Sequence, residues 1–186
     1  MLDVKMDDES RQALENYEKK KFSYVKFLFN IQKEQIELSS TQNSFPKFNI
    51  WDKSSANQKL LIESGNAHQG NTGFHLIRFE HIDSEGQNIE SNILILLVDP
   101  NFTKPKERML YASFCGPFVN LLKTDYSIDI ERRIEADDTN DVTLSYIAQR
   151  LYPQLTSVAV SQSEEVLIKF SKPKGPPGRG PRRIIK

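Results

Sequence analysis

The chain has 186 residues, of which 38% are hydrophobic, and its 25 basic side chains balance its 25 acidic ones. This length suits one domain of ordinary size with a single core. No run approaches the about eighteen apolar residues of a membrane span, and residues 1–10 lack the basic start and apolar run of a signal peptide. The single cysteine, Cys115, excludes an internal disulfide and a cysteine-rich metal site. We therefore expect a soluble cytoplasmic protein without a transmembrane segment.

In the first half of the chain, charge placement predicts a helix and apolar alternation predicts strands. Residues 7–20 begin with three acids and end with lysines, which is the polarity that a helix dipole favours. Residues 22–31 place apolar side chains at alternate positions, as a half-buried strand does. The elements expected after them are a hairpin partner at 35–39, a short helix at 56–63 and a strand at 74–82.

The second half contains a central strand and a long helix. Residues 93–98 (ILILLV) form the uninterrupted apolar run of a strand that is covered on both faces. Pro100 and Pro105 bracket a loop, and apolar residues at spacings of three and four predict a helix over 106–122. A strand at 128–134, a helix at 143–151 and edge strands at 158–160 and 166–170 follow. This order is typical of a mixed sheet with helices on both faces.

The last fifteen residues, 172–186, differ in composition from the rest of the chain. They hold six basic residues and no acid, and five of the six residues at 173–178 are Gly or Pro. Because such a segment opposes helix and sheet and has little to bury, we expect a domain over 1–171 and a disordered basic tail over 172–186. Without the tail the chain carries 19 basic and 25 acidic residues. The net charge of zero is therefore the sum of an acidic domain and a basic tail.

Enzyme chemistry has little support in the sequence. The histidines His68, His75 and His81 show no metal-ligand spacing on a helix, and none has an obvious nucleophile beside it. His75 and His81 fall at an even spacing on one predicted strand, where a structural or surface role is the common one. Cys115 lies within the predicted long helix, where a buried inert thiol is usual, and no glycine-rich phosphate loop is present. We expect a protein that is not an enzyme and has no metal and no cofactor.

The predicted long helix begins with a cluster of basic residues. Lys106, Arg108 and Met109 share its first turn, where the dipole disfavours each exposed cation by about 0.3–1 kcal/mol. One interpretation is that Glu107 neutralises the cluster and that all of it is solvated. The other is a surface that docks into an acidic cleft of a protein partner, with Met109 as an adaptable apolar contact.

The tail also has competing interpretations. Its Pro173–Pro176 spacing is a weak match to an SH3 ligand. Nucleic acid is a poor candidate because no aromatic residue interleaves with the basic ones. Six cations near an anionic membrane contribute about 1 kcal/mol each, and a merely solubilising end remains an alternative.

Several segments resemble a known family. KPKERMLYASF (104–114) resembles the actin-contacting long helix of actin-depolymerising-factor homology domains. More closely, four further segments resemble in order the second such domain of the twinfilin family and its tail: FSYVKFLFNIQKEQIEL (22–38), FHLIRFEH (74–81), ESNILILLVDP (90–100) and FSKPKGPPGRGPRRIIK (170–186). The resemblance implies an α/β fold of α+β type, with a mixed sheet of five or six strands between helices.

The resemblance also implies a function. It implies binding to actin monomers, with preference for the ADP form, slower nucleotide exchange and a contribution at filament barbed ends. Carried over by position, the implied actin contacts are Lys106, Arg108, Met109 and Ser113 on the long helix, Met6 and Asp7 before the first helix, and Arg150 on a second surface near the last helix.

For the tail, the resemblance implies binding to heterodimeric capping protein and to phosphoinositides. The residues implied are Lys172, Lys174, Arg179, Arg182, Arg183, Ile184 and Lys186. The implied protein is a monomer of cortical actin structures that binds no nucleic acid. The alternative is a phosphoinositide-binding adaptor of the cytoskeleton, whose basic tail docks on acidic membranes.

The chain departs from the family pattern in the second half of the long helix. Similar proteins carry basic residues at the positions of Cys115 and Pro117. Pro117 also lacks the amide that would bond to the Ser113 carbonyl, so we expect the helix to kink or restart there. Actin contacts are therefore expected from the first turn of this helix rather than from its second half.

Overall fold

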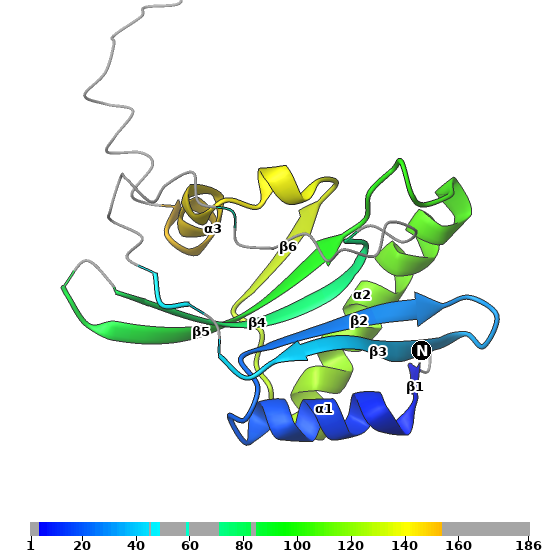
Figure 1. Ribbon diagram of the computed structural model, residues 1–186, viewed down its shortest axis with the longest axis horizontal. Helices are drawn as coiled ribbons and strands as arrows, with labels where there is room; N and C mark the ends of the chain where they lie inside the picture. Colours follow the sequence, from blue (N-terminus) through cyan, green and yellow to red (C-terminus); the bar gives the residue numbers. More distant parts are fainter. Residues whose placement is uncertain (1–3, 45, 49–58, 60–70, 83–84, 154–186) are drawn as a thin grey trace, which may run out of the picture. The chain divides into compact units, whose positions relative to one another are not determined.

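The computed structural model describes residues 4–44, 46–48, 59, 71–82 and 85–153. Within these residues, six strands form one mixed sheet in the order β1-β3-β2-β4-β5-β6 (Figure 1). The four central strands pair antiparallel, whereas β1 and β6 add parallel edges. Helices α1 and α2 cover one face and α3 covers the other. The predicted mixed sheet with helices on both faces is confirmed.

Most elements lie where the sequence predicts them, although several bounds shift by a few residues. The strands are β1 (Lys5–Met6), β2 (Tyr24–Asn30), β3 (Gln35–Gln42), β4 (Gly73–Ile82), β5 (Asn88–Leu97) and β6 (Arg132–Ala136). The helices are α1 (Asp8–Glu18), α2 (Pro105–Tyr126), the short 3₁₀ helix η2 (Thr139–Asp141) and α3 (Leu144–Leu151). The helix expected at 56–63, the edge strands expected at 158–160 and 166–170, and the boundary expected at 171/172 lie outside the described residues, except for Lys59.

Several strands differ from the sequence prediction, since β5 begins at Asn88 rather than at residue 93 and β3 ends at Gln42 rather than at residue 39. β6 begins at Arg132 rather than at residue 128. Ile128 is instead buried in the cluster under α1 and α2, and Ile130 packs against that cluster. These two apolar side chains therefore pack the segment between α2 and β6 against the core, and they do not belong to a strand. The sequence does not predict β1, since its two residues are too few for a periodic pattern, and they are held by parallel pairing with Gln35 and Ile36.

Helix α2 runs without interruption past Pro117, so the predicted restart is wrong, while the alternative, a kink, stays a prediction. The physical reason lies in where the lost hydrogen bond falls. Ser113, whose carbonyl loses its amide partner at Pro117, is on the exposed side of the helix, where water can bond to that oxygen. On the opposite side, Phe114, Phe118 and Leu122 are buried and hold the helix against the sheet.

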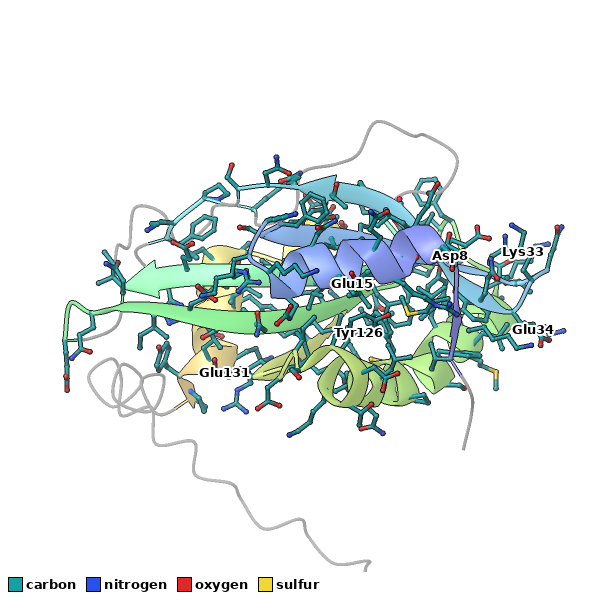
Figure 2. The ribbon with its side chains drawn as sticks, turned by 90° about the horizontal axis from the view of Figure 1, so that it is seen from below. Asp8, Glu15, Lys33, Glu34, Tyr126 and Glu131 are labelled. Atoms are coloured by element: carbon teal, nitrogen blue, oxygen red, sulfur yellow. The ribbon has the colours of Figure 1, made fainter. Side chains whose placement is uncertain are left out.

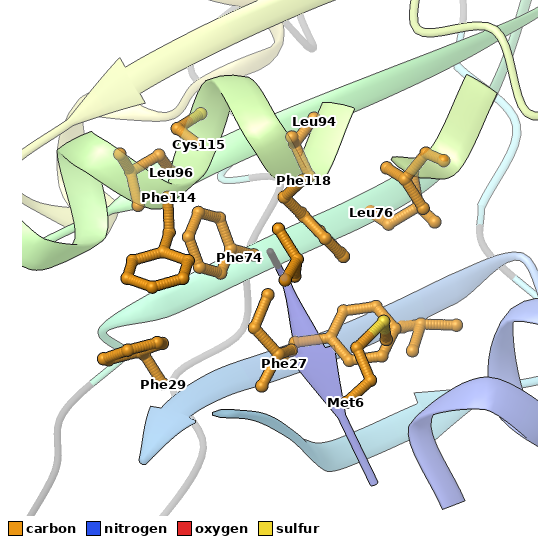
Figure 3. Packing of buried hydrophobic residues seen from close by; sticks show 14 of the residues in the cluster. Met6, Phe27, Phe29, Phe74, Leu76, Leu94, Leu96, Phe114, Cys115 and Phe118 are labelled. Atoms are coloured by element: carbon orange, nitrogen blue, oxygen red, sulfur yellow. The ribbon is translucent and has the colours of Figure 1, made fainter. Parts of the chain in front are cut away.

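Aromatic rings pack together in the core beneath α1 and α2 (Figure 3). The ring of Phe118 lies edge-on to Phe27 with centroids 5.5 Å apart, and 5.1 Å from the ring of Phe74. Phe114 packs against Phe29 at 4.4 Å between centroids. Such pairs add about 0.5–1.5 kcal/mol each beyond the burial of their area. The helix is therefore fixed by its inner face, which leaves its outer face available.

Each face of the sheet also buries a basic side chain of β4. On the α1 face, the Cζ atom of Arg78 lies 4.5 Å from the centroid of the Tyr17 ring. Its Nη1 atom lies 2.6 Å from Oε1 of Glu90, and its Nη2 atom donates to the carbonyl of Tyr17. Arg78 is therefore buried as a paired cation.

On the α3 face, the imidazole of His75 lies between two oxygens. Its Nδ1 atom is 2.8 Å from the hydroxyl of Tyr24, and its Nε2 atom is 2.7 Å from the carbonyl of Asn71. Burial lowers the pKa of His75 to about 3, so the ring is neutral, with Nε2–H donating to Asn71 and Nδ1 accepting from Tyr24. His81 is buried on the same face, 2.7 Å from the Tyr152 hydroxyl. The expected shared face of His75 and His81 is confirmed.

Candidate protein-binding site at the start of helix α2

The start of α2 is fixed by its own sequence. Lys104 has extended backbone and is the N-cap, and Pro105 occupies the first helical position, where its missing amide costs nothing. The carboxylate of Glu107 accepts the backbone N–H of Lys104 at 3.1 Å, which satisfies an amide that the helix leaves without a partner. We call residues 104–109 the basic turn.

The cations of the basic turn point into solvent. Lys104, Lys106 and Arg108 are exposed, and none of them forms an ion pair with any residue that the structure describes. Glu107 serves the helix cap instead of a salt bridge to these cations. By contrast, Lys123 near the other end of α2 lies 3.2 Å from Asp129. Glu107 therefore does not neutralise the cluster through an ion pair, whereas the cations are solvated, as that interpretation also expects.

Met109 and Ser113 lie on the same exposed side of α2 as Lys106. The Met109 side chain is 72% exposed, and the hydroxyl of Ser113 donates to the Met109 carbonyl at 2.7 Å. On the inner side, the hydroxyl oxygen of Tyr111 accepts the backbone N–H of Phe29 at 3.0 Å. The pairing of β2 with β4 ends at Phe27, so Tyr111 replaces a strand partner and fastens the beginning of α2 to the sheet.

The remaining residues implied by the family lie elsewhere. Met6 is 6% exposed and belongs to the core under α2, so its side chain supports the fold rather than a surface (Figure 3). Asp7 caps α1, where its Oδ1 atom accepts the Ser10 N–H at 2.8 Å. Arg150 is exposed on α3, across the sheet from the basic turn, and lies 3.0 Å from the Tyr146 hydroxyl. The seven tail residues named above lie outside the described residues.

A pocket of about 340 Å³ lies beside the basic turn. One wall is the β2–β3 turn with Ile31, and the other is the loop before α2 with Phe102. Figure 2 shows Lys33 and Glu34 at the tip of the β2–β3 turn, at the same end of the sheet as the start of α2. Sequence reasoning missed Phe102, although an aromatic residue in a loop bracketed by two prolines is a detectable signal.

The described part of the chain offers little support for a metal site, a reactive cysteine or a membrane span. There, no group of three or more His, Cys, Asp or Glu residues is placed to hold a metal ion. Cys115 is buried in α2, and burial raises the pKa of its thiol. Among the described helices, none combines the length and apolar character needed to cross a membrane.

Comparison with known proteins identifies the class of this fold. Residues 3–152 match the model of the cofilin/tropomyosin-type actin-binding proteins. The chain belongs to this family, and its sheet and helices form the actin-depolymerising-factor homology fold. Actin depolymerization factor 2 of Plasmodium berghei has a similar structure, with a TM-score of 0.55 and 19% identity over 81% of this chain and 99% of that one.

Within the family, the chain is similar to twinfilins. It is 25% identical to the twinfilin of Aedes aegypti over 185 residues, which cover 100% of this chain and 47% of that protein. The structure of Eh twinfilin matches with a TM-score of 0.51 and 13% identity, over 87% of this chain and 100% of that chain. The chain therefore spans about half the length of the insect twinfilins that it matches.

Proposed function

We propose that this chain binds monomeric actin through the outer side of α2, with Lys106 and Arg108 as ionic contacts and Met109 and Ser113 beside them. The observation that carries this proposal is the basic turn, whose three exposed cations have no described ionic partner and flank a methionine that is 72% exposed. Cations at a helix N-terminus oppose the dipole, and placing them there is accounted for by an acidic partner. Membership of an actin-binding family supplies the partner.

The binding mode has consequences for the actin nucleotide. A helix turn inserted into the cleft of a monomer would restrain the motions that release the nucleotide. The chain should then prefer ADP-actin, slow nucleotide exchange and contribute at barbed ends through Arg150 on its second surface. On this proposal it is a monomeric regulator of cortical actin rather than an enzyme.

The test is a titration of labelled ADP-actin with the full chain and with a Lys106→Ala, Arg108→Ala variant. We expect the variant to bind at least about tenfold more weakly, because two contacts to an acidic surface are lost. Lys123→Ala is the matched control, since Lys123 is an exposed lysine of the same helix that pairs with Asp129. Equal affinity of the double variant and the wild type would contradict the assignment of these positions.

Met109 separates binding from folding. Because its side chain is 72% exposed, Met109→Ala should change the free energy of unfolding by less than about 0.5 kcal/mol. It should nevertheless weaken actin binding several-fold, through loss of an apolar contact. Urea denaturation and the actin titration on the same preparation measure the two effects. A loss of stability with unchanged affinity would be the opposite of the expected result.

We also propose that the tail binds heterodimeric capping protein independently of actin. The similarity to Aedes aegypti twinfilin extends over 185 residues and so includes the tail. Deletion of residues 172–186 should abolish capture of capping protein and leave the affinity for actin monomers unchanged. Loss of both activities on deletion would show that the two sites are not independent.

The second candidate is a membrane adaptor, which the six cations of the tail favour. Phosphoinositides would then be its main partner. Flotation with phosphoinositide vesicles at rising salt tests the membrane adaptor. A tail that binds vesicles by charge alone should release them as the Debye length falls below about 10 Å. Binding to vesicles without binding to capping protein would favour the adaptor.

A further inference from the structure

Exposed apolar side chains lie on the basic turn and beside it. Among the described residues, the exposed large hydrophobic side chains are Ile31 at 39%, Phe102 at 51% and Met109 at 72%. Single exposed apolar residues are normal on a protein surface, whereas several at one end of a molecule mark an interaction site. Ile31 and Phe102 line the same pocket of about 340 Å³, together with Tyr111 from α2.

The first wall of the pocket is a rigid turn. The side-chain oxygen of Asn30 accepts the backbone N–H groups of Gln32 at 3.0 Å and of Lys33 at 3.2 Å. Glu34 completes the turn with a left-handed φ of 51°. These contacts fix the backbone around Ile31, whose exposed side chain lines the pocket.

The second wall is fixed by Asp99. Its carbonyl accepts the backbone N–H of Phe102 at 3.2 Å and of Thr103 at 3.1 Å. Its own N–H donates to the Thr72 hydroxyl at 3.2 Å, which ties the loop to the start of β4. Between the two walls, the pocket includes the rings of Phe29 and Tyr111, whose centroids lie 6.1 Å apart. The pocket is therefore formed before any partner arrives, which lowers the entropic cost of binding.

The charges around the pocket define its occupant. Two acidic residues line it, and both are engaged within the chain. The side chains of Lys33, Asn30 and Gln35 hold the pKa of Glu37 at about 2, and Glu107 accepts the Lys104 N–H. The basic turn keeps a net positive charge, because its three exposed cations have no described ionic partner and outnumber its one acid, Glu107. Acidic residues on a partner would find their counterions there.

We propose that this pocket receives one apolar side chain from an acidic segment of the protein that the basic turn binds. This inference rests on the proposed function, because it extends the actin-binding surface from α2 to the β2–β3 turn. The volume of the pocket lies near the lower end of the about 300–1,000 Å³ range of ligand sites, which suits a single large side chain. The apolar contact would supply affinity, and the cations would supply orientation.

The experiment compares an Ile31→Ala, Phe102→Ala variant with the wild type by titration of labelled monomeric actin at rising salt. We expect binding about tenfold weaker at every salt concentration, because the lost contact is apolar. The loss in the Lys106→Ala, Arg108→Ala variant should instead shrink as salt screens the charges. Leu121→Ala is the control: this half-buried residue of the second half of α2 should affect stability and not affinity.

Three outcomes would overturn the inference. If the wild type binds actin, the basic-turn variant does not, and the pocket variant binds like the wild type, only the pocket assignment fails. If the wild type does not bind actin, the proposed function fails, and this inference fails with it. If sedimentation shows that the chain self-associates and that the pocket variant does not, the occupant is a second copy of this chain.

Discussion

The two faces of the sheet bury a basic side chain of the same strand in opposite charge states. On the α1 face, Arg78 stays charged because Glu90 and the ring and carbonyl of Tyr17 surround its guanidinium. On the α3 face, His75 stays neutral between Tyr24 and Asn71. A cation that cannot lose its proton needs a counter-charge, whereas an imidazole can be buried without one. The α3 face should therefore respond to acid at a higher pH than the α1 face, whose ion pair is lost only when Glu90 is protonated. The pKa of Glu90 is lowered because hydrogen bonds from Arg78 and Lys20 outweigh the effect of burial.

The largest expected effect comes from removing the buried cation. Arg78→Met keeps much of the volume but removes one of the two donors to the Tyr17 carbonyl, which keeps the N–H of Lys20 at 3.0 Å, and leaves Glu90 without its nearest partner. A fully buried pair broken in this way costs about 3–5 kcal/mol. Because Glu90 is 35% exposed and also pairs with Lys20, we expect a loss of about 2–3 kcal/mol of unfolding free energy, measured by urea denaturation.

Lys20→Ala is the matched control for Arg78. It removes the other cation on Glu90, at 3.1 Å, from a side chain that is 66% exposed. Its loss should stay below about 0.5–1 kcal/mol, as for surface pairs in general. Equal losses for the two variants would mean that burial adds nothing to the Arg78 pair.

Acid should weaken the α3 face through His75. Its pKa falls from 6.5 to about 3 on folding, so the unfolded chain binds the proton more readily. The stabilising contribution of neutral His75 is therefore complete above pH 6.5 and is lost as the pH falls toward about 3. Between pH 6.5 and about pH 5 the unfolding free energy should drop by about 2 kcal/mol.

The pH dependence can be assigned by comparison with His75→Gln. An amide can still donate to Asn71 and accept from Tyr24, but it does not titrate in this range. The variant should therefore lack that part of the acid slope, and the other two histidines cancel in the difference. Identical slopes in the variant and the wild type would place the acid sensitivity elsewhere.

The smallest effect concerns the attachment of α3. The hydroxyl of Thr143 accepts the N–H of Tyr146 at 3.3 Å and caps this helix. Thr143→Ala should cost about 1 kcal/mol, and Thr143→Ser should restore most of it. Thermal unfolding of the three proteins measures the difference. If the serine variant is as unstable as the alanine variant, the methyl group of Thr143 matters more than its cap.

Much of the fold follows from local patterns in the sequence. The central strand at 93–98 and the long helix after Pro105 are predictable because uninterrupted apolar runs and spacings of three and four rarely occur outside buried strands and amphipathic helices. Two-residue β1 is not predictable, since only pairing with β3 makes it a strand. The sequence wrongly predicts a restart of α2 at Pro117, because it does not reveal that Ser113, whose carbonyl loses its amide partner, lies on the exposed side of the helix.

For the candidate site, the sequence indicates which residues are basic but not how they are arranged. The family resemblance singles out Lys106 and Arg108, and the structure adds that both are exposed without a described ionic partner. It also places the side chain of Met6 in the core. The sequence alone cannot tell whether this methionine is a core residue or a surface contact. The pocket between Ile31 and Phe102 joins residues far apart in the chain, so no local pattern predicts it.

The hydrogen bond from Phe29 to Tyr111 gives the molecule a built-in reporter. One backbone amide of β2 depends on a side chain of α2 for its protection against exchange with deuterated solvent. If the start of α2 lifts from the sheet, that amide should exchange sooner than its neighbours in the β2–β4 ladder. A partner that holds the helix down should slow it. The contact between the start of α2 and the sheet can thus be followed by hydrogen exchange at the amide of Phe29.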